Sequence, residues 1–393
     1  MKKKLAIIGK GTAGCYALSH FMRWTDWEID LIHDPDIKPQ AVGEGSDLTL
    51  PGNLSDQFDF SFTDLPAVDG SIKLGIRKIN WNGSGDFIHT FPAPASGMHF
   101  NAYRLQKYLI DKHINNKRLT IIEDNVGFNN IDADFIMDCS GRPDNYDDYT
   151  MLNSIPVNSV YVTQCYWDRV DFQYTLTIAR PYGWVFGIPL ANRCSIGYMY
   201  NNTINTLEEV KEDVKEIFKQ FNLNPSDTTS NFSFKNYYKK QNYDARTCYN
   251  GNASFFLEPI EATSITTMDR IQRGAYDVWN NNISQQIATN NYVKYLKEVE
   301  AMIMLHYYAG SIFDTNFWKF AKDRASDVME EAINDLDFYK ILINYKDLND
   351  QNRKLNHSTW TLFSYYQNIT NLGLCDNFGH LLTEVPASKF SAR

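Results

Sequence analysis

The pattern of apolar and polar residues near the N-terminus predicts a β-α-β unit. Residues 5–8 form a continuous apolar run that ends at a glycine, which is typical of a parallel strand buried on both faces. Residues 15–24 suit a helix, and residues 28–33 suit a second strand. The chain is therefore expected to open with a Rossmann-type α/β domain.

The pattern changes twice further along the chain. It predicts short strands up to residue 158, an antiparallel sheet over 159–200, and mainly helices after Met268. The predicted strands are 71–77 (continued by 79–81), its hairpin partner 87–91, and then 119–122, 135–137, 161–166, 172–178, 183–189 and 194–200. The predicted helices are 103–113, 207–221, 292–308, 318–332 and 338–345, and residues 384–393 suit a loose tail.

Three glycines after the first apolar run match the G-x-G-x-x-G pattern of dinucleotide-binding proteins. Gly9 permits a tight turn, Gly11 lets the backbone approach a pyrophosphate, and Gly14 lets the next helix pack against the strand. The start of that helix offers free N–H groups to a phosphate. Because a strand precedes these glycines and a helix follows them, we expect a dinucleotide to bind here.

Composition and charge narrow the classes of partner. The 393 residues carry 38 basic and 47 acidic side chains, a net charge of −9, without a basic block, which argues against nucleic acid. The six cysteines have neither C-x-x-C nor zinc spacing, so free thiols in a cytoplasmic compartment and no metal site are expected. No apolar run approaches the ~18 residues of a membrane span. Aromatic residues make up 14% of the chain, which suits either a large core or a pocket for a flat substrate.

Several polar residues stand where a cofactor would be bound. Asp34 follows the second strand, where an acidic residue often binds a ribose, although His33 occupies the more usual position of that acid. Residues 42–46 form a glycine-flanked loop around Glu44, which is either a surface turn or a strap over a cofactor. Asp138 ends a predicted strand and precedes small residues up to Gly141, as in the second cofactor-facing turn of many FAD-binding proteins.

Lys73 and Glu261 each have a structural and a functional interpretation. In isolation, Lys73 is a solvated residue of an alternating strand, whereas a buried lysine would be a strong donor or a nucleophile with a lowered pKa. Glu261 stands where an apolar stretch and Pro259 lead into a predicted helix, so in isolation it is a carboxylate stabilised by the helix dipole.

Five segments, in order, resemble the flavin-dependent halogenases of the tryptophan halogenase family. They are residues 9–14 (GKGTAG), 42–45 (VGEG), 73–81 (KLGIRKINW), 256–265 (FLEPIEATSI) and 306–318 (HYYAGSIFDTNFW). The glycine motif is shared with many flavoproteins, whereas the last two segments are much more specific. The resemblance covers the chain from its start to Trp318 and its immediate surroundings.

This resemblance implies an enzyme that uses FADH2, O2 and halide to make hypohalous acid, which halogenates an electron-rich, indole-like or phenol-like small molecule. Lys73 would present the oxidant by a hydrogen bond or as a haloamine, and Glu261 would orient the oxidant or take the ring proton. Halide would sit at the backbone amides of Thr263 and Ser264. The implied FAD-binding residues are Gly9, Gly11, Thr12, Ala13, Gly14, Asp34, Gly43, Glu44, Asp138, Gly141 and Ile265.

The resemblance also suggests neighbours of the site. His89, Phe91 and Trp360 are candidates for the substrate pocket, with a place in the aromatic core as the alternative for each. His306 and Trp318 are expected to hold helices together. No NAD(P)H-reducing module is recognisable, so a separate flavin reductase is the expected partner, and a homo-oligomer is left open.

The motifs and the element pattern together divide the chain into four segments. Residues 1–158 are expected to form the FAD-binding Rossmann-type (GR2-like) domain, with the Lys73 hairpin inserted in it. Residues 159–250 would form the antiparallel floor of a substrate lobe. Residues 251–270 would return to the flavin domain, and residues 271–393 would form a mostly helical substrate lobe.

Departures from the family pattern keep other functions open. The WxWxIP motif of the family, which is thought to disfavour monooxygenase chemistry, has Phe186 in place of its second tryptophan. A flavin monooxygenase that hydroxylates an aromatic compound is therefore one alternative, and a flavin-binding protein without turnover is another. Ala262 replaces a serine of the family, and the chain is short after Trp318, which argues against free tryptophan as the substrate.

Overall fold

The N-terminal strands form a parallel sheet that carries the glycine motif at its carboxyl edge. The computed structural model describes residues 2–37, 43–92, 94–124, 131–167, 171–335, 338, 340–342, 360–375 and 378. The sheet has the order β17-β9-β1-β2-β8, and every neighbouring pair is parallel. Its strands are β1 (Lys4–Ile8), β2 (Glu28–His33), β8 (Leu119–Glu123), β9 (Phe135–Asp138) and β17 (Thr247–Tyr249). Their carboxyl ends meet at one edge, where open α/β sheets bind ligands.

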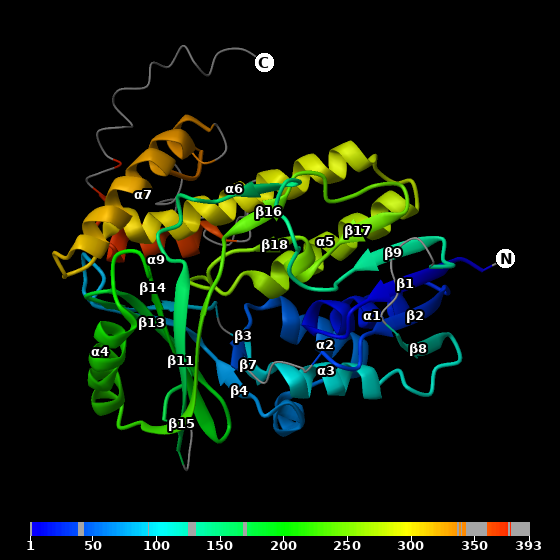
Figure 1. The fold of residues 1–393 in the computed structure, drawn as a ribbon, viewed down its shortest axis with the longest axis horizontal. Coiled ribbons are helices and arrows are strands. Elements are labelled where there is room, and N and C mark those ends of the chain that lie inside the picture. The colour runs from blue at the N-terminus through cyan, green and yellow to red at the C-terminus, as the bar shows by residue number, and fades with distance from the viewer. Residues whose placement is uncertain are drawn as a thin grey trace.

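Helix α1 (Thr12–Trp24) is enclosed by the rest of this domain. It connects β1 to β2 and packs against α3 (Ala102–Asp111) and α5 (Ser264–Trp279) (Figure 1). All residues from Ala13 to Met22 are buried, so the helix is enclosed on every side, and the polar side chains of Ser19 and His20 are buried with the apolar ones. A segment from beyond residue 260 thus returns to the N-terminal domain.

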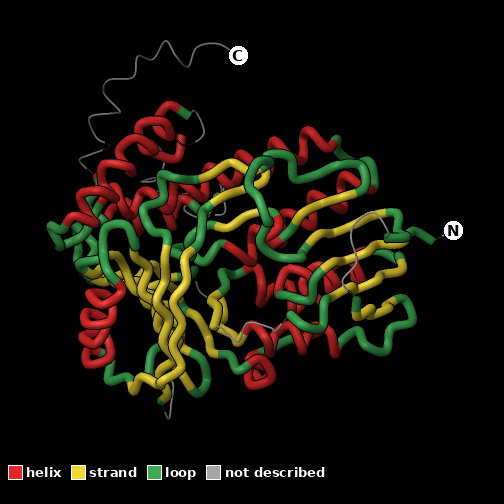
Figure 2. The backbone as a smooth tube through the Cα atoms, in the orientation of Figure 1, coloured by secondary structure: helices red, strands yellow, loops and turns green. Residues whose placement is uncertain are grey.

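A larger mixed sheet forms the second layer of the molecule. Its order is β15-β11-β14-β13-β12-β5-β6, and α4 (Leu207–Gln220) packs beside it (Figures 1 and 2). The strands are β5 (Gly75–Ile79), β6 (Asp86–Thr90), β11 (Ser159–Tyr166), β12 (Thr175–Arg180), β13 (Gly183–Pro189), β14 (Arg193–Tyr200) and β15 (Asn224–Ser233). Neighbouring pairs are antiparallel except β12 and β5, which are parallel. The predicted antiparallel sheet over 159–200 is therefore one part of a mixed sheet.

The chain changes sheets at Leu74, so the prediction of a single strand over 71–77 is wrong. β4 (Ser71–Lys73) pairs with β7 (Gly97–Asn101), which also pairs with β3 (Gly43–Gly45). Gly75 then starts β5 so close to β6 that a Cβ atom there would lie 2.3 Å from the carbonyl oxygen of His89. Leu74 itself is 39% exposed, so the alternation that suggested one strand does not correspond to one buried face.

Helices cover the upper side of the sheets in the view of Figure 1. α6 (Gln285–Ala309) packs against both α5 and α7 (Asn316–Asn334), and α9 (Leu362–Asn371) packs against β6. The remaining elements are α2 (Thr49–Phe58), η1 (Phe62–Val68), η3 (Gly251–Ala253) and a small sheet of β10 (Tyr149–Met151), β16 (Tyr237–Lys239) and β18 (Phe255–Phe256). One hydrophobic core extends from α1 through α6 to α7 and α9. Among the described residues, no helix is both long and apolar enough to cross a bilayer.

The predicted α/β fold with a Rossmann-type parallel sheet is confirmed. Residues 339 and 343–345 of the predicted helix 338–345, and the predicted tail at 384–393, lie outside the described residues. The division into four segments stays a prediction. β17 lies within the segment 159–250, although it pairs with β9 in the parallel sheet.

Candidate active site

The three glycines of the N-terminal motif lie where the backbone is most crowded or most open. A Cβ atom on Gly9, whose φ is +99°, would lie 2.3 Å from the carbonyl oxygen of Cys139. A Cβ atom on Gly14 would lie 1.9 Å from the carbonyl oxygen of Gly9, so only glycine lets α1 pack this closely on β1. Gly11 has no atom within 4 Å of its Cβ position among the described residues, and this open backbone suits the approach of a pyrophosphate.

The start of α1 presents amides to the same open space. Gly11 is the N-cap and has no side chain to accept a hydrogen bond from the first turn. The first amides of a helix have no partners within the helix, so those of Thr12, Ala13 and Gly14 are available to a phosphate. The hydroxyl of Thr12 accepts a hydrogen bond of 3.1 Å from Gln106 Nε2, which fixes its position. These residues fit a bound dinucleotide.

The ends of β2 and β9 place acidic residues on either side of the glycine motif. Asp34 follows β2, and its Oδ1 accepts a hydrogen bond of 2.8 Å from the amide of Asp36. His33 is buried, with Nε2 2.9 Å from Lys10 Nζ, so it faces the glycine loop. Asp138 ends β9, and its Oδ1 accepts a hydrogen bond of 2.9 Å from the amide of Ser140, while burial raises its pKa.

The glycine-flanked loop at 43–45 forms strand β3 instead of a free surface turn. Burial raises the pKa of Glu44 to about 7, and a hydrogen bond with Thr12 partly opposes this rise. Glu44 therefore connects β3 to the start of α1, next to the predicted cofactor site. Val42 of the same motif lies outside the described residues. Ile265 is buried in a cluster that includes Tyr16 of α1.

Lys73 is fully buried, contrary to its interpretation as a solvated strand residue. Its Nζ atom has no hydrogen-bond partner within the described part of the chain. A Cβ atom on Gly45 would lie 3.5 Å from this Nζ, so the amine lies against β3. The Nζ is 5.6 Å from the centre of the Phe91 ring. Burial lowers the pKa of Lys73 to about 8, and the charges of Asp47 and Glu261 partly oppose this effect.

Glu261 is also buried and lies at the centre of a polar cluster. Its Oε2 accepts a hydrogen bond of 3.1 Å from Trp360 Nε1 and lies 3.8 Å from His89 Nδ1. Its Oε1 lies 2.5 Å from Nζ of Lys78 and 3.1 Å from Nε2 of His306. The structure therefore brings together Glu261 and two of the three predicted pocket residues, and the third, Phe91, lies beside Lys73.

The lysine in contact with Glu261 is Lys78. It is fully buried on β5 and donates to Glu261, to His306 and, over 2.7 Å, to Oδ1 of Asn368 on α9. Burial alone would raise the pKa of Glu261, but the charge of Lys78 holds it well below its usual value. The charges of Glu261 and Lys78 both affect the pKa of Lys73: Glu261 raises it and Lys78 lowers it.

The turn between Glu261 and α5 has a strained backbone. Ala262 has φ +53°, a left-handed conformation that costs an ordinary L-residue roughly 1–2 kcal/mol. It reverses the chain so that Thr263 becomes the N-cap and Ser264 the first residue of α5. Thr263 makes no side-chain capping hydrogen bond, and the first amides of α5 have no partners within the helix.

Glu258 forms a second buried carboxyl site three residues before Glu261. Its Oε2 accepts hydrogen bonds from the Tyr307 hydroxyl (2.7 Å) and from Trp184 Nε1 (3.4 Å). Its Oε1 has no hydrogen-bond partner in the described part of the protein. Burial raises the pKa of Glu258 to about 8, so the group is largely protonated at neutral pH.

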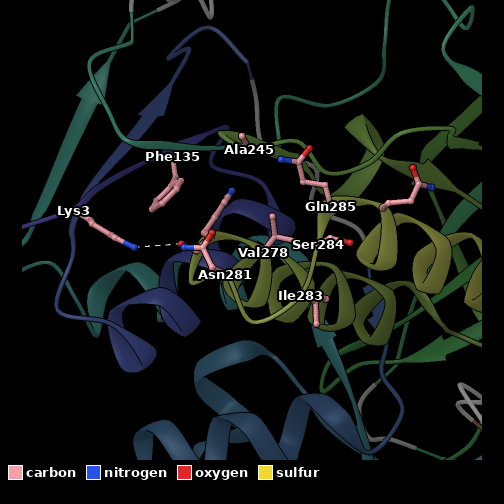
Figure 3. A pocket seen from close by; sticks show the side chains of 10 residues that line it. Lys3, Phe135, Ala245, Val278, Asn281, Ile283, Ser284 and Gln285 are labelled. Carbon is pink, nitrogen blue, oxygen red and sulfur yellow. Dashed lines mark hydrogen bonds between the residues drawn. The ribbon is translucent and has the colours of Figure 1, made fainter.

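One pocket of the described surface lies away from this site. A pocket of about 530 Å³ opens at the amino edge of the parallel sheet, where Lys3 precedes β1 and Phe135 begins β9 (Figure 3). The glycine motif lies at the opposite ends of these strands. A smaller, mainly apolar pocket of about 320 Å³ lies between α2, η1 and β7 and is lined by Ile72 and Gly97 next to Lys73.

Comparisons with known proteins decide the family. The family model described as tryptophan halogenase matches residues 4–126 and 118–374. The chain belongs to the tryptophan halogenase family. It is 23% identical to tryptophan 7-halogenase RebH of Lentzea aerocolonigenes, with 94% of this chain and 89% of that protein covered.

Solved structures agree on the fold. A tryptophan halogenase of Shewanella frigidimarina superposes with a TM-score of 0.79 at 16% identity, covering 99% of this chain and 91% of the other. Tryptophan 6-halogenase SttH of Streptomyces toxytricini superposes with a TM-score of 0.75 at 16% identity, covering 99% and 98%. As a member of this family the protein is an enzyme, a flavin-dependent halogenase, and its dinucleotide is FAD.

The sequence did not identify the roles of three buried residues of this halogenase. Lys78 alternates with the apolar residue Ile76 on β5, so a charge on an apolar face was the signal that could have revealed it. His306 was expected only to hold helices together, yet its Nε2 lies in the Glu261 cluster. Glu258 precedes a proline in an apolar run, and nothing in that local pattern shows that Trp184 and Tyr307 converge on it.

Proposed function

We propose that this halogenase uses reduced FAD, O2 and a halide ion to make hypohalous acid, and that it transfers the halogen to an electron-rich aromatic small molecule. A separate flavin reductase supplies the reduced FAD. The observation that carries the proposal is the Lys73 amine, which is fully buried, has no hydrogen-bond partner among the described residues, and lies against β3 and near Glu261.

The residues of the Rossmann edge hold the cofactor in this proposal. Gly9, Gly11 and Gly14 leave room for the pyrophosphate, and the first amides of α1 bind it. When bound, FAD supplies the redox chemistry with O2, and the protein contributes placement and exclusion of water. Burial of Lys73 and Glu261 provides that exclusion at the site of halogen transfer.

Halide binding is assigned to the start of α5. The amides of Thr263 and Ser264 open this helix, and the partial positive charge of a helix N-terminus favours an anion. The left-handed backbone of Ala262 connects this turn directly to Glu261. The proposed halide site therefore adjoins Glu261 in sequence, and the hypohalous acid would travel through an internal channel to Lys73.

Lys73 presents the halogen to the substrate. A protonated Lys73 would donate a hydrogen bond to hypohalous acid, which makes the halogen more electrophilic. A neutral Lys73 would instead react with hypohalous acid to give a haloamine and water. With a pKa of about 8, both forms of Lys73 exist near neutral pH. The pH dependence of the rate therefore separates the two routes. The rate of the hydrogen-bond route should fall as the pH rises through about 8, and the rate of the haloamine route should rise.

The substrate is proposed to be an aromatic ring of the indole or phenol class. Phe91 lies beside the Lys73 amine. Burial lowers the pKa of His89 to about 4, so its ring is neutral, and its Nδ1 has no hydrogen-bond partner among the described residues. Trp360 is bound to Glu261 through its indole N–H, so it borders the same cluster.

A halide panel with a supplied flavin reductase tests the proposed function. Chloride, bromide and iodide are each offered with a set of indoles and phenols, and the product mass is followed. We expect halogenated product from the wild type and none from Lys73→Ala with FAD binding retained. Halogenation by Lys73→Ala at the wild-type rate would contradict the role of the lysine.

Hydroxylation is the alternative that one residue favours. Phe186 replaces the second tryptophan of the WxWxIP motif. Its ring packs on Gly197, because a Cβ atom on Gly197 would lie 2.0 Å from the ring. An oxygenated product that forms without halide would support a monooxygenase instead.

A further inference from the structure

Lys78 is surrounded by hydrogen-bond acceptors from three separate parts of the chain. Glu261 precedes α5, His306 belongs to α6, and Asn368 belongs to α9. A lysine ammonium has three protons to donate, and these three acceptors satisfy all of them. Burial lowers the pKa of Lys78, and the charge of Glu261 together with these hydrogen bonds opposes this effect and favours the ammonium form.

The hydrogen bonds of His306 show that its ring does not neutralise Glu261. Its Nδ1 lies 2.8 Å from the carbonyl oxygen of Met302, which can only accept, so Nδ1 carries the proton. The other nitrogen, Nε2, is then left to accept from Lys78. Burial lowers the pKa of His306, which agrees with a neutral ring.

The two oxygens of Glu261 are held by different partners. Oε1 faces Lys78, and Oε2 accepts the indole N–H of Trp360. His89 faces Oε2 from β6, but burial keeps this ring neutral as well. Among the described residues, the ammonium in contact with Glu261 is that of Lys78, and Lys73 interacts with Glu261 from further away.

We propose that Lys78 is a positioning residue that keeps the Glu261 carboxylate ionised and fixed in orientation. Glu261 then acts as a permanent negative charge beside Lys73 and the oxidant. It is a poor acceptor for the ring proton, because the ion pair with Lys78 and the hydrogen bond from Trp360 stabilise the ionised form and make the carboxylate a weak base. This assignment chooses between the two roles that sequence left open for Glu261.

Within the proposed function, the assignment makes Lys78 necessary for halogen transfer without contact with the halogen. The catalytic part of this inference rests on the proposed function, whereas the ionisation of Glu261 does not. The two parts therefore need separate readouts.

Infrared spectroscopy tests the ionisation of Glu261 without any turnover. The difference spectrum between wild type and Glu261→Gln should contain an ionised carboxylate from about pH 5 to about pH 8. Lys78→Met should show a protonated carboxyl at neutral pH that the double variant Lys78→Met/Glu261→Gln lacks. A protonated Glu261 in the wild type, or an ionised one in Lys78→Met, overturns the proposal.

The pH profile of halogenation tests the catalytic part. In Lys78→Met, the rate should fall about tenfold for each pH unit below the raised pKa of Glu261 and recover at alkaline pH. Lys78→Arg should restore the wild-type profile. The control is Arg77→Met, which removes the neighbouring charge of β5 from a partly exposed pair with Asp86. A Lys78→Met profile parallel to that of wild type overturns the catalytic part.

Two provisions keep the tests decisive. If Lys78→Met does not fold, Lys78→Gln removes the charge but retains a donor, and the same spectra and profiles apply. If the wild type gives no halogenated product with any halide, the proposed function fails, while the infrared result still decides whether Lys78 holds Glu261 ionised.

Discussion

The Nζ atom of Lys78 lies 2.5 Å from Oε1 of Glu261, and the two side chains are 0% and 1% exposed. The ion pair joins β5 to the turn before α5, and Asn368 and His306 extend it to α9 and α6. Elements from four distant parts of the chain thus depend on one buried pair of charges.

Loss of either partner of this pair should destabilise the protein strongly. Glu261→Gln leaves the buried Lys78 ammonium without its counter-ion, and Lys78→Met forces Glu261 to take up a proton; breaking a buried ion pair in this way typically costs about 3–5 kcal/mol. The double variant Lys78→Met/Glu261→Gln removes both charges, so it should be more stable than either single variant. Thermal or denaturant unfolding of the four proteins measures this cycle. Additive losses in the double variant would show that the two residues do not compensate each other.

Lys73→Met is expected to change activity and stability in opposite directions. It should abolish halogenation, because no amine remains to present the halogen. It should also raise Tm by roughly a few degrees at neutral pH, since holding the buried amine charged costs on the order of 3 kcal/mol. Product analysis and a melting curve on the same preparation measure both effects, and FAD binding is the control. A lower Tm would indicate that Lys73 has a stabilising partner.

The stabilising effect of Lys73→Met should disappear at alkaline pH. The pKa of Lys73 is about 8 in the folded protein and near 10.5 when unfolded, so the unfolded chain binds more protons between these values. The wild type therefore gains stability relative to the variant as the pH rises from about 8 to about 10.5. Melting curves of both proteins across this range measure the difference, and a constant difference would contradict the lowered pKa.

Glu258→Gln should have the opposite pH dependence. The pKa of Glu258 is raised to about 8 in the folded protein, so the unfolded chain loses its proton first and the wild type loses stability as the pH rises from about 4.5 to about 8. Glutamine resembles the protonated carboxyl and can still accept from Tyr307 and Trp184. Tm should be similar for both proteins at about pH 5 and higher for the variant at about pH 8. Equal Tm values at both pH values would place Glu258 in a more hydrated site.

Gly11→Ala and Gly14→Ala separate cofactor binding from folding. The Cβ position of Gly11 is open and its φ of −74° suits alanine, so the fold should survive while FAD binds more weakly. A Cβ atom on Gly14 would lie 1.9 Å from the carbonyl oxygen of Gly9, so this variant should lose stability as well. Circular dichroism and FAD titration distinguish the two outcomes. Unchanged FAD affinity in a folded Gly11→Ala would contradict the assigned pyrophosphate site.

The N-terminal domain could be predicted from sequence because its signals are local. The apolar run at 5–8, the glycine spacing and the helix that follows all act within one β-α-β unit, and the structure has β1, α1 and β2 at those places. The break at Leu74 could not be predicted, since it depends on β7 and β6, which pair with the two sides of the break.

The sequence identified residues of the candidate site but did not predict which residues contact one another there. Lys73 and Glu261 were singled out by resemblance, and the structure buries both. The ion-pair partner of Glu261 is Lys78, however. Lys78 is also bound by His306 and Asn368, which lie 228 and 290 residues from it in the sequence. Local alternation contains no information about such distant acceptors, and neither does the spacing of a motif.

Because the chain changes sheets at Leu74, the two buried lysines belong to different sheets. Lys73 lies on β4, which pairs with β7 and is joined through it to β3, whereas Lys78 lies on β5 and donates a hydrogen bond to Asn368 of α9. Sequence changes in the C-terminal helices would therefore be expected to displace Lys78 and Glu261 more than Lys73. Variation in substrate choice could accumulate in this way without rebuilding the point of halogen delivery.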